Sequence, residues 1–276
     1  MRLRCSCAPD TTGPSVADIT RRISALLDKA DRTDNPFEAE AYVMKAQALA
    51  TMASIDIAAA RVRAPERNEP ITRTVVIGEK GKRANQHLIA LFVVVADANS
   101  AHVDVAADST YVLGYGMPGD LDMVEALYAT ISVQMVSSAA GYIAAGAWRQ
   151  ETYLVRGSRR TRKPFTAQTA RAAFYRAYVD RIGERLQEAR REGIRESDRE
   201  AGRLGGALVL RDAERRVRDF HRQTSSARGR WGGYSGGARP SGSAGTEGRA
   251  AASRARLGTR GEVRGDRGRL GPGGTP

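Results

Sequence analysis

Clustered arginines are the residues of this 276-residue chain whose types and spacing indicate chemistry most directly. The run 156–163 holds five cations in eight positions, namely Arg156, Arg159, Arg160, Arg162 and Lys163. Guanidinium and ammonium groups bind phosphate oxygens through charge-assisted hydrogen bonds. The run therefore predicts contacts to a nucleic-acid backbone, against the alternative of an ordinary solvated loop.

A second group of candidates lies near the C-terminus, where residues 222–276 hold 15 glycines and 11 arginines against 3 acids, a charge of +8 (11 minus 3). A segment of this composition buries too little apolar surface to offset its ordering entropy, so we expect it to be disordered. Arg/Gly-rich segments bind nucleic acid without sequence preference, and aromatic rings among them stack on bases. The candidates in this tail are Arg228, Arg230, Trp231 and Tyr234.

Acidic residues offer a different chemistry. Carboxylates that converge can hold a divalent metal for phosphodiester hydrolysis, and the candidates are Asp104, Asp108, Asp120, Asp122 and Glu125. Helix capping explains acids at these positions equally well. The chain has 3 histidines without ligand spacing and 2 cysteines, Cys5 and Cys7, so we predict no metal and no cofactor. No catalytic residue is assigned, and a binding protein is favoured over an enzyme.

The elements that must position these residues follow from hydrophobic periodicity. Alternation predicts a strand over 72–77 and a hairpin over 102–106 and 110–115, and a short apolar run predicts an edge strand over 207–210. The run 84–98 could form a buried strand by its β-branched content, but its length and polar start favour a helix. Further helices are predicted over 117–148, 165–191 and 212–221. The uncharged stretch 126–148 contains Ser, Gln and Gly, which favour a buried central helix over a membrane span. We expect an α+β fold, with a small sheet of about three strands packed on long helices and a disordered C-terminal tail.

The N-terminal part predicts a helical hairpin, because Asn35, Pro36 and Glu38 form a strong helix start after a polar turn. It resembles the family called domain of unknown function 2786, a helical module of actinobacterial and phage-encoded proteins. The matching residues are Ile23, Leu26, Leu27, Lys29, Ala30, Thr33, Asn35, Pro36, Glu38, Ala39, Glu40, Ala41, Lys45, Ala46, Gln47, Leu49, Ile55 and Asp56. This resemblance implies no established activity and no catalytic residues.

The resemblance extends to the uncharacterised α/β region that accompanies this module, through Gly114, Asp120, Glu125, Leu127, Tyr128 and Gln134. Residues 232–258 also resemble the Gly- and Ala-rich end of such proteins at their beginning and end, while the middle is displaced. A frameshift near residues 233–238 is one hypothesis for that displacement.

The predicted organisation is a disordered leader over 1–17, the helical hairpin over 18–60, a linker over 61–70, an α/β domain over 71–221 and the disordered tail over 222–276. The net charge of +13 (44 minus 31) favours anionic partners. Because the first residues lack the apolar run of a signal peptide, we expect a cytoplasmic protein without membrane contact.

The leading functional hypothesis is a nucleic-acid-associated accessory protein of phage or mobile-element type that contacts DNA or RNA through phosphates. One alternative is a metal-dependent hydrolase acting on phosphodiesters. The other is a structural or protein-interaction module whose helical hairpin docks on a partner protein.

Overall fold

The computed structural model describes residues 69–154, 161–200, 205–229, 231–233 and 242–255, together with scattered helical residues between 22 and 52. Its main sheet is three-stranded and antiparallel and consists of β1 (Ile71–Val76), β2 (His102–Val105) and β3 (Tyr111–Gly116), in the order β1-β3-β2. The helices are α3 (Asn85–Ala98), α4 (Pro118–Ala145), α5 (Ala167–Glu200), α6 (Gly205–Thr224) and α7 (Gly242–Arg254). The predicted α+β class and the three-stranded sheet are confirmed. The predicted leader, and most of the predicted hairpin and linker, lie outside the described residues.

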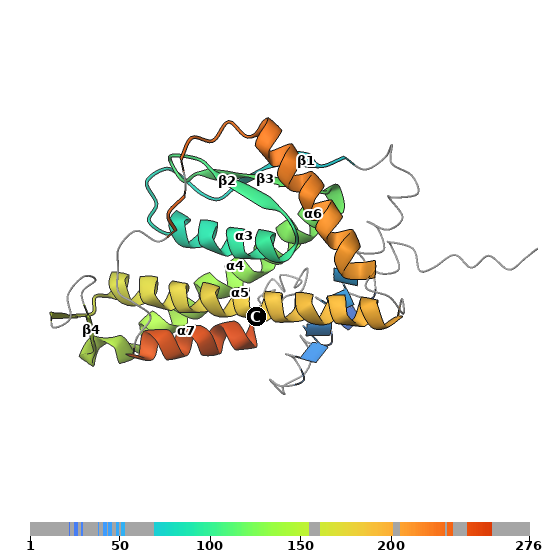
Figure 1. Ribbon diagram of the computed structural model, residues 1–276. Coiled ribbons are helices and arrows are strands. Elements are labelled where there is room, and N and C mark those ends of the chain that lie inside the picture. Colours follow the sequence, from blue (N-terminus) through green and yellow to red (C-terminus); the bar gives the residue numbers. More distant parts are fainter. Residues whose placement is uncertain are drawn as a thin grey trace, which may run out of the picture.

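Helices cover both faces of this sheet, as Figure 1 shows. On one face, Gly114 and Gly116 leave room for α4, since a Cβ on either would lie 3.2 Å from the Leu121 side chain. On the opposite face, Tyr115 packs edge-on against Phe220 of α6, with ring centroids 6.3 Å apart. Alternate residues of one strand point to opposite faces, so β3 separates an α3/α4 layer from α6.

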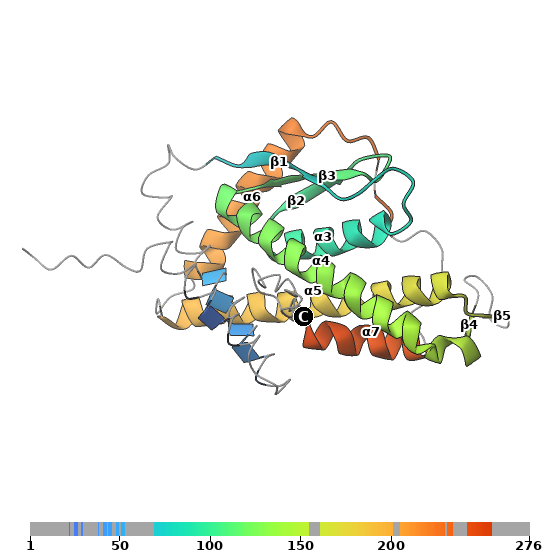
Figure 2. The ribbon, with the colours of Figure 1, turned by 180° about the vertical axis from the view of Figure 1, so that it is seen from behind.

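The long helix α4 crosses the molecule diagonally (Figure 2). It starts with Pro118, which lacks the N–H that a first helical turn leaves unpaired, and it ends at Gly146, whose φ of 77° suits glycine. The expected helix over 117–148 is thus shorter, and the 3-10 turn η2 (Ala147–Gln150) follows it. In the part of the chain that the structure describes, no helix is long and apolar enough to cross a membrane.

A small second sheet pairs β4 (Thr152–Leu154) with β5 (Arg162–Pro164) at one end of the molecule (Figures 1 and 2). It was not predicted from the sequence. The strands have only three residues each and consist of Thr, Tyr and Leu against Arg, Lys and Pro, so neither carries the alternation that marks a strand.

Helix α5 is the central support of the fold. Phe174, Tyr178, Ile182 and Leu186 form one stripe at the 3-4 spacing of a helix face, and each is at most 1% exposed. Further along, α5 receives the N-terminal segment at Gly193, where a Cβ would lie 2.7 Å from the carbonyl oxygen of Ala48 and 2.8 Å from the Cβ of Thr51. Only glycine allows so close an approach.

One prediction about the C-terminal third is wrong, and another is wrong over part of its range. Residues 207–210, expected as an edge strand, lie in the first turns of α6, because Leu210 and Val217 form the buried side of one amphipathic helix. The tail expected to be disordered from residue 222 instead continues α6 to Thr224 and forms α7, which buries Ala244, Gly245, Gly248 and Ala252. Residues 225–229 and 231–233 form neither helix nor strand. The rest of the tail lies outside the described residues.

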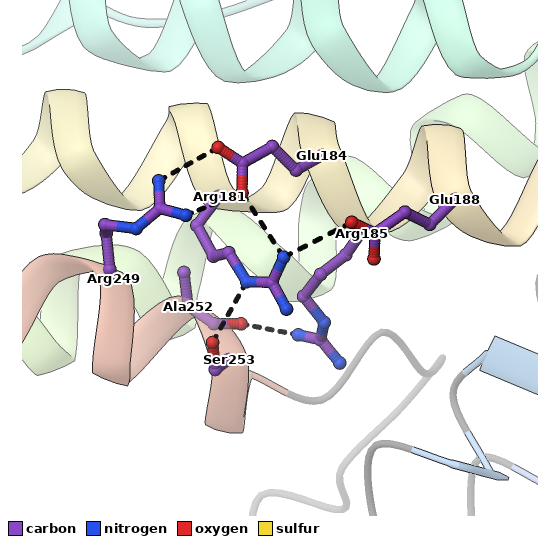
Figure 3. Close-up of polar contacts among 7 residues, drawn as sticks. All are labelled: Arg181, Glu184, Arg185, Glu188, Arg249, Ala252 and Ser253. Atoms are coloured by element: carbon purple, nitrogen blue, oxygen red, sulfur yellow. Dashed lines mark hydrogen bonds and ion pairs between the residues drawn. The ribbon is translucent and has the colours of Figure 1, made fainter.

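The docking of α7 on α5 explains how a helix rich in Gly, Ala and Ser is stable. At Gly248 a Cβ would lie 2.6 Å from the carbonyl oxygen of Phe174, so glycine lets the two backbones touch. The guanidinium of Arg185, 1% exposed, donates a hydrogen bond to the carbonyl oxygen of Ala252 near the end of α7 (Figure 3). It donates another to the carbonyl oxygen of Ala255, which follows the helix. A cation at a helix C-terminus also interacts favourably with the helix dipole.

Charged residues on the rim of the same contact join the two helices further (Figure 3). Arg249 of α7 binds both carboxylate oxygens of Glu184, at 2.9 and 2.7 Å. Arg181 donates to the hydroxyl of Ser253 at 3.1 Å and to Glu184 at 3.2 Å. Backbone contact, buried cation and rim pairs together make α7 an integral part of the fold.

Candidate nucleic-acid interface

The outer side of α6 carries a row of arginines. Arg211, Arg215, Arg218 and Arg222 follow one another at steps of four, three and four residues, and all are exposed. At 3.6 residues per turn they fall within an arc of about 60°, and at 1.5 Å per residue they span about 16 Å. We call these four residues the arginine face.

Most of the arginine face has no acidic partner. Within the arginine face, Arg222 forms an ion pair with Asp219 at 3.7 Å. Arg211, Arg215 and Arg218 form no ion pair with a described residue. The exposed arginines near the end of α5 differ, since Arg195 binds Glu192 at 3.4 Å and Arg199 binds Glu196 at 2.8 Å. The two helices therefore present different surfaces. The end of α5 is locally neutralised, and α6 offers free cations.

The inner side of α6 is held firmly. Arg190 of α5 donates hydrogen bonds to the carbonyl oxygen of Ala98 at 2.6 Å and to the hydroxyl of Ser100 at 2.9 Å. The same guanidinium forms an ion pair with Glu214 of α6. Leu210 and Val217 are buried on either side of Glu214. These contacts fix the rotation of α6 about its axis, and so fix which side faces solvent.

A polar cluster lies where the end of α6 meets the sheet. His221 Nε2 lies 2.9 Å from Asp104 Oδ1, and the hydroxyl of Ser225 donates to Asp104 Oδ2 at 2.6 Å. The His102 ring stacks on that of His221, with centroids 5.3 Å apart, and Tyr115 packs edge-on against His221 at 4.7 Å. His102 and Tyr115 are directly opposite in the β2/β3 pairing, so both point to the α6 face of the sheet.

Electrostatics in this cluster favour the charged carboxylate. Burial alone would raise the pKa of Asp104, but hydrogen bonds from Ser225, His221 and Tyr115 outweigh it and lower that pKa. Burial raises the pKa of Tyr115 to about 12, and its hydrogen bond to Asp104 acts in the same direction. Burial also lowers the pKa of His102, and the nearby charges of His221 and Arg218 lower it further.

The predicted phosphate contacts occupy two separate places. Arg162 and Lys163 are exposed on β5, where Arg162 Nε donates to the hydroxyl of Thr152 at 2.8 Å. Figures 1 and 2 both place this small sheet well away from α6. Arg228 and Trp231 are exposed in the segment that follows α6. The remaining candidates lie outside the described residues: Arg156, Arg159, Arg160, Arg230 and Tyr234.

The candidate acidic residues do not converge. Asp122 and Glu125 of α4 both bind Arg73 of β1, at 2.6 and 3.2 Å. Asp108 accepts hydrogen bonds from Thr110, and Asp104 belongs to the cluster beside α6. Asp120 lies in the first turn of α4. Over the described ranges, no group of three or more His, Cys, Asp or Glu side chains could hold a metal ion.

Neither the arginine face nor the polar cluster beside it was predicted from the sequence, for two different reasons. The steps of four, three and four between the arginines of α6 are visible in the sequence. The run 156–163 has a higher density of cations, however, and phosphate contacts were predicted there instead. Asp104 and His221 are 117 positions apart. Nothing in the local pattern of either residue indicates that they meet.

Comparison with known proteins concerns only the N-terminal segment. Residues 18–56 match the family model described as protein of unknown function (DUF2786). These residues are a DUF2786 domain. No curated protein and no solved structure matches the chain. The DUF2786 domain contains none of the residues of the arginine face, so the interface rests on the geometry of α6 alone.

Proposed function

We propose that this protein binds nucleic acid through the arginine face of α6. One observation carries the proposal. Arg211, Arg215 and Arg218 are exposed on one side of a firmly held helix, and they have no acidic partners among the described residues. Free guanidinium groups form strong hydrogen bonds with phosphate oxygens. A rigid row of them meets successive phosphates without first ordering a flexible segment.

The length of the row suits a phosphate backbone as the ligand. The four arginines span about 16 Å along α6. Phosphates of one duplex strand follow one another at about 3.4 Å of helix rise, so the row covers about five phosphate steps. Contacts to phosphates position a protein without reading bases. Binding is therefore independent of sequence, which suits an accessory role.

Two further exposed residues follow α6 in the chain. Arg228 and Trp231 are exposed in the segment that follows the helix, where a guanidinium can bind another phosphate and an indole can stack on a base. The basic residues of β5, Arg162 and Lys163, lie apart from α6 and form a second, weaker contact in this proposal.

Salt dependence of binding tests the proposal. Fluorescence anisotropy would follow labelled single-stranded DNA, single-stranded RNA and duplex DNA titrated with the full chain. Four phosphate contacts to a single strand give a slope of about −3 for log affinity against log salt, a loss of roughly 50-fold between about 50 and 200 mM. The proposal is refuted when none of the three probes binds at the lower salt concentration.

A further inference from the structure

Two stacked imidazole rings lie beside the arginine face. His102 and His221 have ring centroids 5.3 Å apart and planes inclined by only 14°. His221 belongs to α6, and Arg218 of the arginine face lies one helical turn before it. The charge of Arg218 is also one of the causes that lower the pKa of His102 on β2, after burial and the charge of His221. The imidazole pair is therefore continuous with the proposed phosphate-binding surface.

Both imidazole rings have nitrogen atoms that form no hydrogen bond to a described residue. His221 Nε2 donates to Asp104, and its Nδ1 has no partner among the described residues. His102 forms no hydrogen bond to a described residue at either nitrogen. The His221 side chain is 25% exposed and His102 is half-buried, so neither is sealed from solvent. A protonated imidazole donates from both nitrogens.

The acids around the pair are already engaged. Asp104 of β2 accepts from His221 and Ser225, Asp97 of α3 accepts from Gln187 at 2.8 Å, and Glu214 of α6 pairs with Arg190. Tyr115 of β3 keeps its proton, because burial raises its pKa to about 12. When both imidazoles are protonated, they and Arg218 together leave positive charge that these acids do not fully neutralise.

We propose that His102, His221 and Arg218 form a phosphate subsite of the nucleic-acid interface, occupied when the two imidazoles are protonated. The subsite rests on the proposed function, since its phosphate belongs to the same backbone that the arginine face binds. Without an anion, two stacked imidazolium ions repel each other and Arg218. A phosphate that bridges them removes this repulsion, so binding is accompanied by proton uptake.

The sign of the pH dependence follows from this linkage. Burial and the neighbouring positive charges lower the pKa of His102 in the free protein. A bound phosphate favours the charged form and raises that pKa. Affinity therefore increases as the pH falls from about 8 to about 5.5, and each unit by which a bound phosphate raises an imidazole pKa corresponds to at most tenfold in affinity.

Proton NMR of the imidazole Hε1 signals tests the subsite directly, because the chain has only 3 histidines. Single His→Gln variants assign the signals, and pH titrations are recorded with and without a saturating single-stranded oligonucleotide. We expect the midpoint of His102, whose pKa burial lowers in the free protein, to rise by about one unit when the oligonucleotide is bound. His87 is the internal control, since it is buried against Tyr175 and its midpoint should not move.

A double variant, His102→Gln with His221→Gln, completes the test. Glutamine at 221 retains an N–H that can donate to Asp104, so the sheet contact has a substitute. Affinity for the oligonucleotide should lose its pH dependence in this variant. The subsite is refuted, and the proposed function kept, when the oligonucleotide binds at pH 8 but the midpoint of His102 does not move. Absence of binding at every pH refutes both.

Discussion

His87 lies buried in α3 with 5% of its surface exposed, and its ring contacts Tyr175 at a centroid distance of 5.2 Å. Burial, assisted by the charge of Arg176, lowers its pKa from 6.5 to about 4. The unfolded chain therefore binds this proton at higher pH than the folded protein does. Stability that is present above pH 6.5 is lost as the pH falls towards 4.

This difference predicts the acid sensitivity of the fold. Between pH 7 and pH 4, the His87 contribution to the free energy of unfolding should fall by about 3 kcal/mol. Urea unfolding of the wild type and of His87→Gln at both values measures it, because glutamine cannot take up the proton. An equal loss of stability with pH in the two proteins would show that His87 is not the buried base responsible.

Among the elements, the docking of α7 depends on glycine at one contact. A Cβ at Gly248 would lie 2.6 Å from the carbonyl oxygen of Phe174 and 2.9 Å from the Cβ of Ala177. Gly141, on the exposed side of α4, has nothing within 4 Å of the same position. The two glycines form a matched pair, since both are helical and only one touches another helix.

Alanine at the two positions should have opposite effects. Gly141→Ala should stabilise the protein by up to about 1 kcal/mol through helix propensity. Gly248→Ala should destabilise it by about 1 to 3 kcal/mol, because α7 must move away from α5. Thermal unfolding gives the signs, and hydrogen exchange of residues 242–254 shows whether α7 has separated. Stabilisation by Gly248→Ala would mean that α7 does not pack in this way.

The elements that the sequence predicted correctly are those with a strong local pattern. The β-branched alternation of β1 and of the β2/β3 hairpin, the length and polar start of α3, and the apolar spacing of α5 identify these elements from the sequence alone. Helix α7 is not predicted, because Ala and Gly stabilise it by close approach to α5, which hydrophobicity does not reveal. The strands β4 and β5 are also not predicted, because each has only three residues without apolar alternation and is defined by its pairing with the other.

The candidate site was less predictable than the fold. The sequence indicated correctly that exposed arginines are numerous, but it could not show which of them are neutralised. Arg195 and Arg199 look like Arg211 and Arg215 in sequence, and only the structure pairs the former with acids. The His102, Asp104 and His221 cluster requires the packing of α6 on the sheet, a contact between distant parts of the chain.

For the molecule as a whole, net charge and the arrangement of charge give different predictions. The chain carries +13, and a strongly basic protein attracts polyanions over all of its surface. The proposed function instead locates the main contacts on α6. Variants that remove equal charge from two different helices separate these explanations.

The most direct measurement compares two triple variants that each lower the net charge from +13 to +10 (13 minus 3). One replaces Arg211, Arg215 and Arg218 of α6 by glutamine. The other replaces three exposed arginines of α5, Arg191, Arg195 and Arg199, of which Arg195 and Arg199 are paired with acids. The α6 variant should weaken binding of single-stranded DNA steeply and reduce the salt slope by about two, while the α5 variant should keep nearly the wild-type slope. Equal losses in both variants would contradict binding through the arginine face.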